Sequence, residues 1–101
     1  MPRGNDPLGE IASKVLFENE RVKIWNLIIE PQEACPWHQH ERDYVTVRLA
    51  GEPTTLELED GTKLPGSSEL GQWQYHTDHK VHRVINHNDS QYTNILIEIK
   101  G

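Results

Sequence analysis

The sequence has 101 residues, 35% of them hydrophobic, and its ten basic and sixteen acidic residues give a formal net charge of -6. This length allows a single domain with a small core. The acidic balance and the lack of a Lys- or Arg-rich face argue against nucleic acid and anionic membranes as partners. Cys35 is the single cysteine, so an internal disulfide is excluded and a reducing compartment is favoured. Without a signal-peptide pattern or a membrane-spanning apolar stretch, we expect a cytoplasmic protein.

Residues 1–12 combine Pro, Gly, Asn and Asp with few apolar side chains, which predicts a flexible N-terminal arm or an edge strand. From residue 13 to residue 100 the pattern is that of one strand-rich domain. Short β-branched and aromatic runs are separated by turn signals such as Asp60-Gly61 and Pro65-Gly66-Ser67-Ser68. The runs that we expect to form strands are 15–17, 22–29, 44–50, 54–59, 72–75, 81–85 and 92–100. No capped amphipathic helix interrupts them, so the sequence predicts an all-β sandwich or barrel.

Two histidines, His38 and His40, are separated by one residue in the middle of the chain. In an extended strand, residues i and i+2 project from the same face, so both imidazoles can reach one metal ion. A third nitrogen is available from His82, and a closed sheet can bring such distant segments together. Three imidazoles would leave coordination positions open for a substrate.

These segments resemble the two signature segments of cupins, which are small jelly-roll β-barrels. The first cupin segment has His-x-His, then a Glu and later a Gly; His38, His40 and Gly51 match it, whereas Tyr44 occupies the Glu position. The second has a His followed four residues later by Asn, and His82 and Asn86 match it. Thr77 and His79 stand at its Pro and Gly positions. The resemblance covers about residues 13–100.

Within the cupins, the sequence is similar to small single-domain members that include proteins assigned to β-alanine degradation. The similarity is carried by the runs 17–25 and 43–45. The resemblance implies a single antiparallel jelly-roll barrel with one divalent transition metal on His38, His40 and His82. Iron is the first expectation, and nickel, manganese, zinc and copper accept the same ligands.

Tyr44 is the main departure from the cupin pattern. A phenol is a reluctant metal ligand at neutral pH because its ordinary pKa is about 10. Tyr44 can instead orient a bound water or substrate oxygen, or it can pack as an amphipathic barrel residue. Asp43 is a reserve ligand, although strand alternation places it on the opposite face.

Arg48 shares a strand face with Tyr44 and Thr46 if the strand is regular. With no bulge between His40 and Tyr44, this face points into the barrel, and Arg48 becomes a clamp for a substrate carboxylate. With a bulge, Arg48 is a solvated charge. Solvated arginines are the more common case, whereas the resemblance supports the inward orientation.

The remaining reactive side chains have ordinary explanations. We expect His76 and His79 in turns or on the surface, with one of them as a possible proton shuttle. Cys35 is either a buried thiol, a soft metal ligand or an oxidation-sensitive group.

The predicted function is that of a metal-binding cupin, most simply a mononuclear metalloenzyme of the dioxygenase, lyase or isomerase type. Its expected substrate is a small carboxylate or keto acid, with Tyr44 and Arg48 as the catalytic side chains. The alternative is a non-catalytic cupin that binds a metal or a small acid as a sensor or accessory protein. Exposed barrel edges and the N-terminal arm predict a homodimer.

Overall fold

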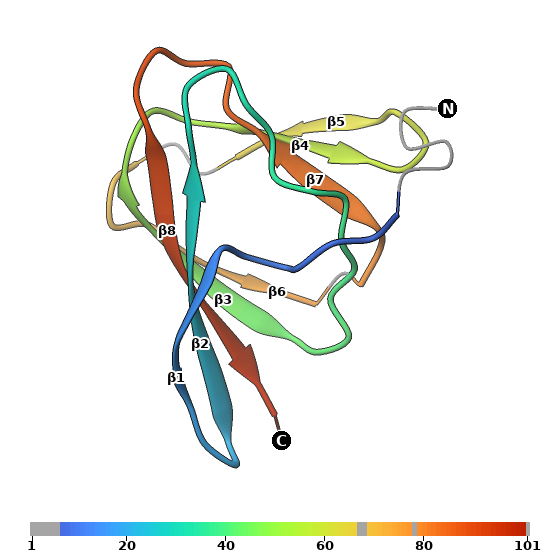
Figure 1. Ribbon diagram of the computed structural model, residues 1–101, viewed down its shortest axis with the longest axis vertical. Helices are drawn as coiled ribbons and strands as arrows, with labels where there is room; N and C mark the ends of the chain where they lie inside the picture. Colours follow the sequence, from blue (N-terminus) through green and yellow to red (C-terminus); the bar gives the residue numbers. More distant parts are fainter. Residues whose placement is uncertain (1–6, 67–68, 78, 101) are drawn as a thin grey trace.

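The computed structural model describes residues 7–66, 69–77 and 79–100, and all regular structure in them is antiparallel β-strand (Figure 1). The predicted all-β fold class is therefore confirmed. None of these residues forms a helix of the length and hydropathy needed to span a bilayer. The strands are β1 (Lys14–Glu18), β2 (Val22–Ile29), β3 (Tyr44–Ala50), β4 (Thr55–Leu58), β5 (Lys63–Pro65), β6 (Trp73–His76), β7 (His82–Ile85) and β8 (Tyr92–Ile99).

The strands form two sheets. The larger has the order β1-β2-β8-β3-β6, and the smaller has the order β5-β4-β7. In Figure 1 the smaller sheet lies across one end of the larger one. The segment between β2 and β3 joins the two through isolated bridges from Ala34 to Ile85 and from His38 to His82. This segment brings the predicted ligands of the middle of the chain to β7.

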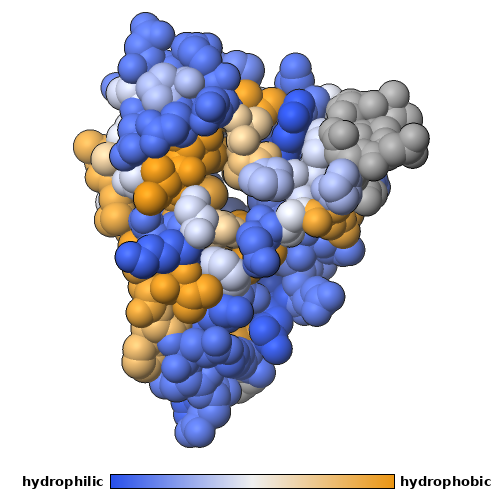
Figure 2. Space-filling view, in the orientation of Figure 1, coloured by the Kyte–Doolittle hydropathy of each residue, from blue (hydrophilic) through white to orange (hydrophobic). Residues whose placement is uncertain are grey.

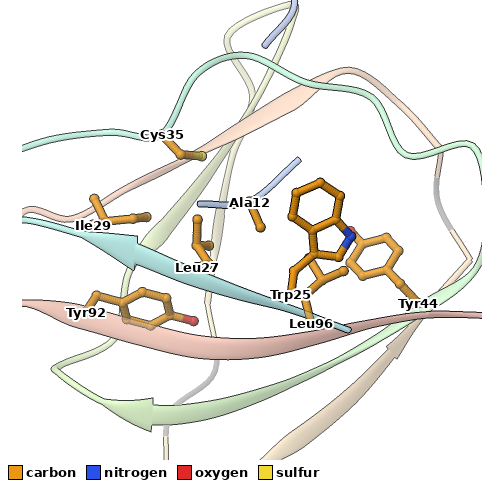
Figure 3. Close-up of a cluster of buried hydrophobic side chains, with 8 residues drawn as sticks. All are labelled: Ala12, Trp25, Leu27, Ile29, Cys35, Tyr44, Tyr92 and Leu96. Atoms are coloured by element: carbon orange, nitrogen blue, oxygen red, sulfur yellow. The ribbon is translucent and has the colours of Figure 1, made fainter. Parts of the chain in front are cut away.

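The inner side of the five-stranded sheet carries the core. Because side chains alternate along a strand, β2 directs Trp25, Leu27 and Ile29 to this side, and all three are buried. Figure 3 shows them packed with side chains from β3, β8 and the connecting segments. The full cluster is Ala12, Trp25, Leu27, Ile29, Cys35, Tyr44, Tyr92 and Leu96.

The opposite side of this sheet, which we call the outer face, is mostly apolar. The strand register places on it the residues Lys14, Phe17, Val22, Ile24, Asn26, Ile28, Val45, Val47, Ala50, Trp73, Tyr75, Thr93, Ile95, Ile97 and Ile99. Lys14, on the edge strand β1, is the one charged residue in this list, although 26% of the chain is charged. Figure 2 shows apolar surface gathered along the side where β8, β2 and β1 lie.

The predicted strands all occur, and no end is shifted by more than one residue. The short strand β5 was missed because three residues carry too little alternation to recognise. Ser67 and Ser68 of the predicted turn lie outside the described residues, as do residues 1–6 of the predicted arm. Residues 9–12 are held in place: the Gly9 N–H donates to the Trp37 carbonyl at 2.7 Å, and Ala12 is buried in the core.

Candidate metal centre

His38, His40 and His82 come together inside the barrel. One ligand nitrogen from each lies within 4.8 Å of the others, and each residue is at most 4% exposed. The backbones of His38 and His82 exchange two hydrogen bonds of 2.9 Å, which fix the two segments against each other. The structure thus joins the three histidines that the sequence pattern selected.

The chemical state of these imidazoles suits metal binding. His38 Nδ1 lies 2.9 Å from the Pro36 carbonyl, which can only accept, so Nδ1 carries the hydrogen and Nε2 keeps its lone pair. Burial lowers the pKa of His38. It also lowers the pKa of His40 to about 2, with the charges of His38 and His82 acting in the same direction. Both side chains are therefore neutral at neutral pH, as metal ligands must be.

The protein groups fit a divalent transition metal. His40 Nδ1 is buried and has no hydrogen-bond partner among the described residues, so its burial is not compensated by the protein. A set of three imidazoles suits iron, nickel, copper and zinc, and leaves open positions on the ion. A carboxylate does not complete the set, because the cluster in the described residues consists of the three histidines alone.

Tyr44 lies between two imidazoles. Its ring stacks on His40 with a centroid distance of 3.7 Å and on His76 with a distance of 4.5 Å. Tyr44 is buried and faces His76 directly in the β3–β6 register. The residue at the cupin Glu position thus links a predicted ligand to a further histidine.

The expectation of a turn or surface position for His76 was wrong. It ends β6, is half-buried and lines the same cavity as the three ligands. Its Nε2 lies 2.9 Å from Thr46 Oγ1, and burial lowers its pKa. The alternation of Gln74 and His76 with Trp73 and Tyr75 is the sequence signal that could have identified it.

Arg48 is buried on the inner side of β3 with Tyr44. Its side chain therefore points into the barrel and is not a solvated surface charge. Within β3 the strand irregularity lies after Arg48, and residues 41–42 form a bend between His40 and Tyr44. Arg48 is not among the residues that line the cavity. Its charge acts on the hydroxyl of Tyr92, whose pKa is raised by burial and lowered in part by Arg48 and Asn94.

The other reserve groups do not join the cluster of ligand atoms, although Cys35 Sγ lies 3.9 Å from His38 Nδ1. Asp43 accepts a hydrogen bond from the Tyr75 hydroxyl at 3.2 Å and pairs with the exposed His79 at 3.1 Å. Cys35 accepts from the Val84 N–H at 3.2 Å, and burial raises its pKa to about 11. The thiol is therefore protonated and buried, as in the prediction of a buried thiol, and this makes it a poor soft metal ligand.

Asn86, the last residue of the second signature segment, has a structural task. It is fully buried, and its Nδ2 donates to the carbonyls of Ile29 at 3.1 Å and Ser90 at 2.8 Å. Its Oδ1 accepts from the Asn88 N–H at 3.1 Å. Asn86 therefore ties the β7–β8 turn to the end of β2 behind the ligand His82.

The histidines open into a cavity of about 160 Å³ between the two sheets. Apart from the ligands, its described lining is neutral: apolar side chains, hydroxyls, amides and one imidazole. These residues are Ile11, Leu27, Tyr44, Thr46, Thr54, Leu56, Leu64, Pro65, Gly66, Gln74, His76, Val84, Tyr92, Asn94 and Leu96. None of these residues would present a positive or negative charge to a bound ligand.

Solved structures of other proteins share this architecture. A cupin domain from Bordetella pertussis Tohama I matches with a TM-score of 0.76 and 29% sequence identity, over 92% of this chain and 100% of that chain. This chain has the cupin fold. A Cupin 2 conserved barrel domain protein from Salinispora arenicola CNS-205 matches with a TM-score of 0.67 and 19% identity, over 96% and 82% of the two chains.

A cupin fold is also shared with an enzyme, the DMSP lyase DddQ from Ruegeria pomeroyi DSS-3, at a TM-score of 0.61 and 15% identity. That match covers 80% of this chain and 39% of the lyase chain. No family model matches the sequence, and no curated protein matches it. The fold together with the three-histidine cluster supports a metal-binding cupin.

Proposed function

We propose that this protein is a mononuclear cupin metalloenzyme in which His38, His40 and His82 hold one divalent transition metal. Iron is the first candidate, and nickel, manganese, zinc or copper are the alternatives. The observation that carries the proposal is the convergence of three buried imidazoles, with ligand atoms within 4.8 Å, on one cavity. When bound, such an ion supplies Lewis acidity and, in the case of iron, dioxygen chemistry, so the reaction is of the dioxygenase, lyase or isomerase type.

The substrate in this proposal is a small acid with one carboxylate, such as a keto acid. The described cavity lining has no cationic side chain, so a second carboxylate or a phosphate would find no counter-charge except the ion. Leu27, Leu56 and Leu96 offer an apolar surface to the rest of the molecule. The resemblance to proteins assigned to β-alanine degradation agrees with a small monocarboxylate and stays a prediction.

The protein groups that can move a proton are Tyr44 and His76. His76 is neutral at neutral pH because burial lowers its pKa, and Thr46 holds its Nε2. It can accept or donate a proton at the cavity wall, with the Tyr44 ring keeping it in place. Arg48 keeps a role in the proposal as a source of positive potential behind Tyr92, not as a direct clamp.

Metal analysis tests the site. The protein, purified without added metal, is expected to contain close to one transition-metal ion per chain, and His82→Ala is expected to lose it. His87→Ala is the matched control, because His87 is exposed and outside the cavity. An unchanged metal content in His82→Ala would refute His82 as a ligand.

Catalysis is tested separately from binding. Metal-loaded protein is incubated in air with a panel of mono- and dicarboxylates, and both oxygen uptake and product formation are followed. Turnover of a monocarboxylate supports the enzyme. Ligand-induced thermal stabilisation without turnover supports the alternative, a non-catalytic sensor or accessory cupin, which the lack of a carboxylate base in the described lining favours. In either case the unpaired Cys35 agrees with a cytoplasmic location.

A further inference from the structure

The outer face is unusual for a surface in contact with water. Its largest side chains are the most exposed: Trp73 is 69% exposed and Tyr75 is 53% exposed. The apolar surface continues from Tyr75 across the sheet. It follows the paired neighbours Val45 on β3, Ile97 on β8 and Ile24 on β2. Contiguous apolar surface of this kind marks an interaction site on a soluble domain.

We propose that the outer face binds the same face of a second copy of this chain, with the two sheets packed against each other. A two-fold related copy presents the same largely apolar surface, so the contact needs no second type of site. The aromatic side chains at β6 and the lack of charge on β2, β3, β6 and β8 match the composition of interface cores, and Lys14 at the β1 edge would lie at the rim. The proposal moves the predicted homodimer contact from the barrel edges and the N-terminal arm to this face.

The size of the outer face fits a stable dimer. Its long strands have seven or eight residues. β1 and β6 are shorter, with five and four residues. With a spacing of about 4.8 Å between strands and about 3.3 Å per residue, the five strands together cover roughly 500 Å² in projection. Side chains that protrude from the sheet make the accessible area larger than this projected area, close to the value of about 800 Å² that each partner buries in a stable interface. A lipid surface is a poorer occupant, because Lys14 is the only basic residue that the described strands place on this face and the chain has a net charge of -6.

Dimerisation would also support the candidate site. Strand β6 has four residues, lies at the sheet edge and pairs with β3 only. Its Trp73 and Tyr75 belong to the outer face, whereas Gln74 and His76 line the cavity. A second copy that covers Trp73 therefore holds one wall of the cavity in place, whether or not a metal is bound.

Sedimentation of wild-type protein and two glutamate variants tests the proposal. We expect the wild type to have twice the chain mass of 11.7 kDa. Trp73→Glu should weaken the dimer on the order of a hundredfold, because each copy would bury a charge. Leu8→Glu is the matched control: Leu8 is 45% exposed, lies off the sheet and belongs to the predicted arm. It should leave the dimer intact.

Two further measurements keep the outcome decisive. Circular dichroism of dilute samples checks that Trp73→Glu is folded, and Ile28→Glu, on another strand of the outer face, should give the same loss of dimer. A wild type that is monomeric at every concentration overturns the proposal, as does a monomer that binds neutral lipid vesicles. Loss of the dimer in Leu8→Glu with retention in Trp73→Glu overturns it too, and places the contact on the arm.

Discussion

The inner and outer faces of the five-stranded sheet differ from those of an ordinary half-buried sheet. Such a sheet packs its apolar side on the core and turns its polar side to water. In this protein both sides are largely apolar: the inner side carries the core and also buries the polar residues Arg48, Asn94 and Glu98, while the outer face exposes aliphatic and aromatic residues. The inner side holds the candidate site, and the outer face is the surface that the proposed dimer would cover.

Neighbouring residues on β3 provide the strongest test of this contrast. Tyr44→Ala removes a buried ring from between two imidazoles, so we expect it to lower the free energy of unfolding by about 3–5 kcal/mol. Val45→Ala, one residue along on the outer face, should cost about 1 kcal/mol or less in the monomer. Urea unfolding of dilute, metal-free samples measures both values.

Tyr44→Phe is the control for the hydroxyl, since it keeps the stacked ring. It should retain most of the stability of the wild type, so a change in turnover in this variant would report on the phenol alone. Equal losses of stability for Tyr44→Ala and Val45→Ala would show that the inner side is no better packed than the outer one.

Acid should destabilise the metal-free protein through its inner side. The pKa of His40 falls from its ordinary value of about 6.5 in the unfolded chain to about 2 in the folded one, chiefly because of burial. The unfolded state therefore binds more protons between these values, and stability falls as the pH is lowered. We expect a loss of about 1.4 kcal/mol for each pH unit below about 6 from His40, with His38 and His76 acting in the same direction.

Unfolding of metal-free protein at several pH values measures this slope. His40→Asn should reduce it, because the variant lacks one group that must charge on unfolding. His87→Ala, which removes an exposed histidine, should leave it unchanged. A stability that is constant from pH 7 to pH 5 would contradict the burial of neutral histidines in the candidate site.

The sequence was sufficient for the strands, and for His38 and His40 on one face, because both depend on the local period of two along β-strands. His82 was identified through the resemblance to the second cupin segment. The sequence was not sufficient for the orientation of Arg48 or the position of His76. The first depends on where β3 is irregular, and that is set by its pairing with β8. For the second, the alternation along β6 separates His76 from Trp73 and Tyr75, but the side that faces inward is set by the pairing of His76 with Tyr44, a contact between distant segments.

The smallest expected effects come from exchanging two adjacent side chains of similar shape on opposite sides of β3. Thr46→Val removes the hydroxyl that lies 2.9 Å from His76 Nε2, so it should cost about 1 kcal/mol in stability and leave the dimer unchanged. Val47→Thr places a hydroxyl on the outer face next to Ile95 and Trp73. It should leave the monomer stable to within about 0.5 kcal/mol and weaken the dimer about tenfold, since two hydroxyls become buried without partners.

The two substitutions separate the faces because each has an effect that the other lacks. Urea unfolding of dilute samples measures the loss of stability in Thr46→Val, and sedimentation measures the weaker association of Val47→Thr. If Val47→Thr changes neither the stability of the monomer nor the strength of its association, no partner removes water from the outer face. If Thr46→Val changes only association, the hydroxyl does not hold His76, and the cavity wall is positioned by the Tyr44 stack alone. The pair therefore tests, within one strand, whether the inner side positions the cavity wall while the outer face binds a second copy.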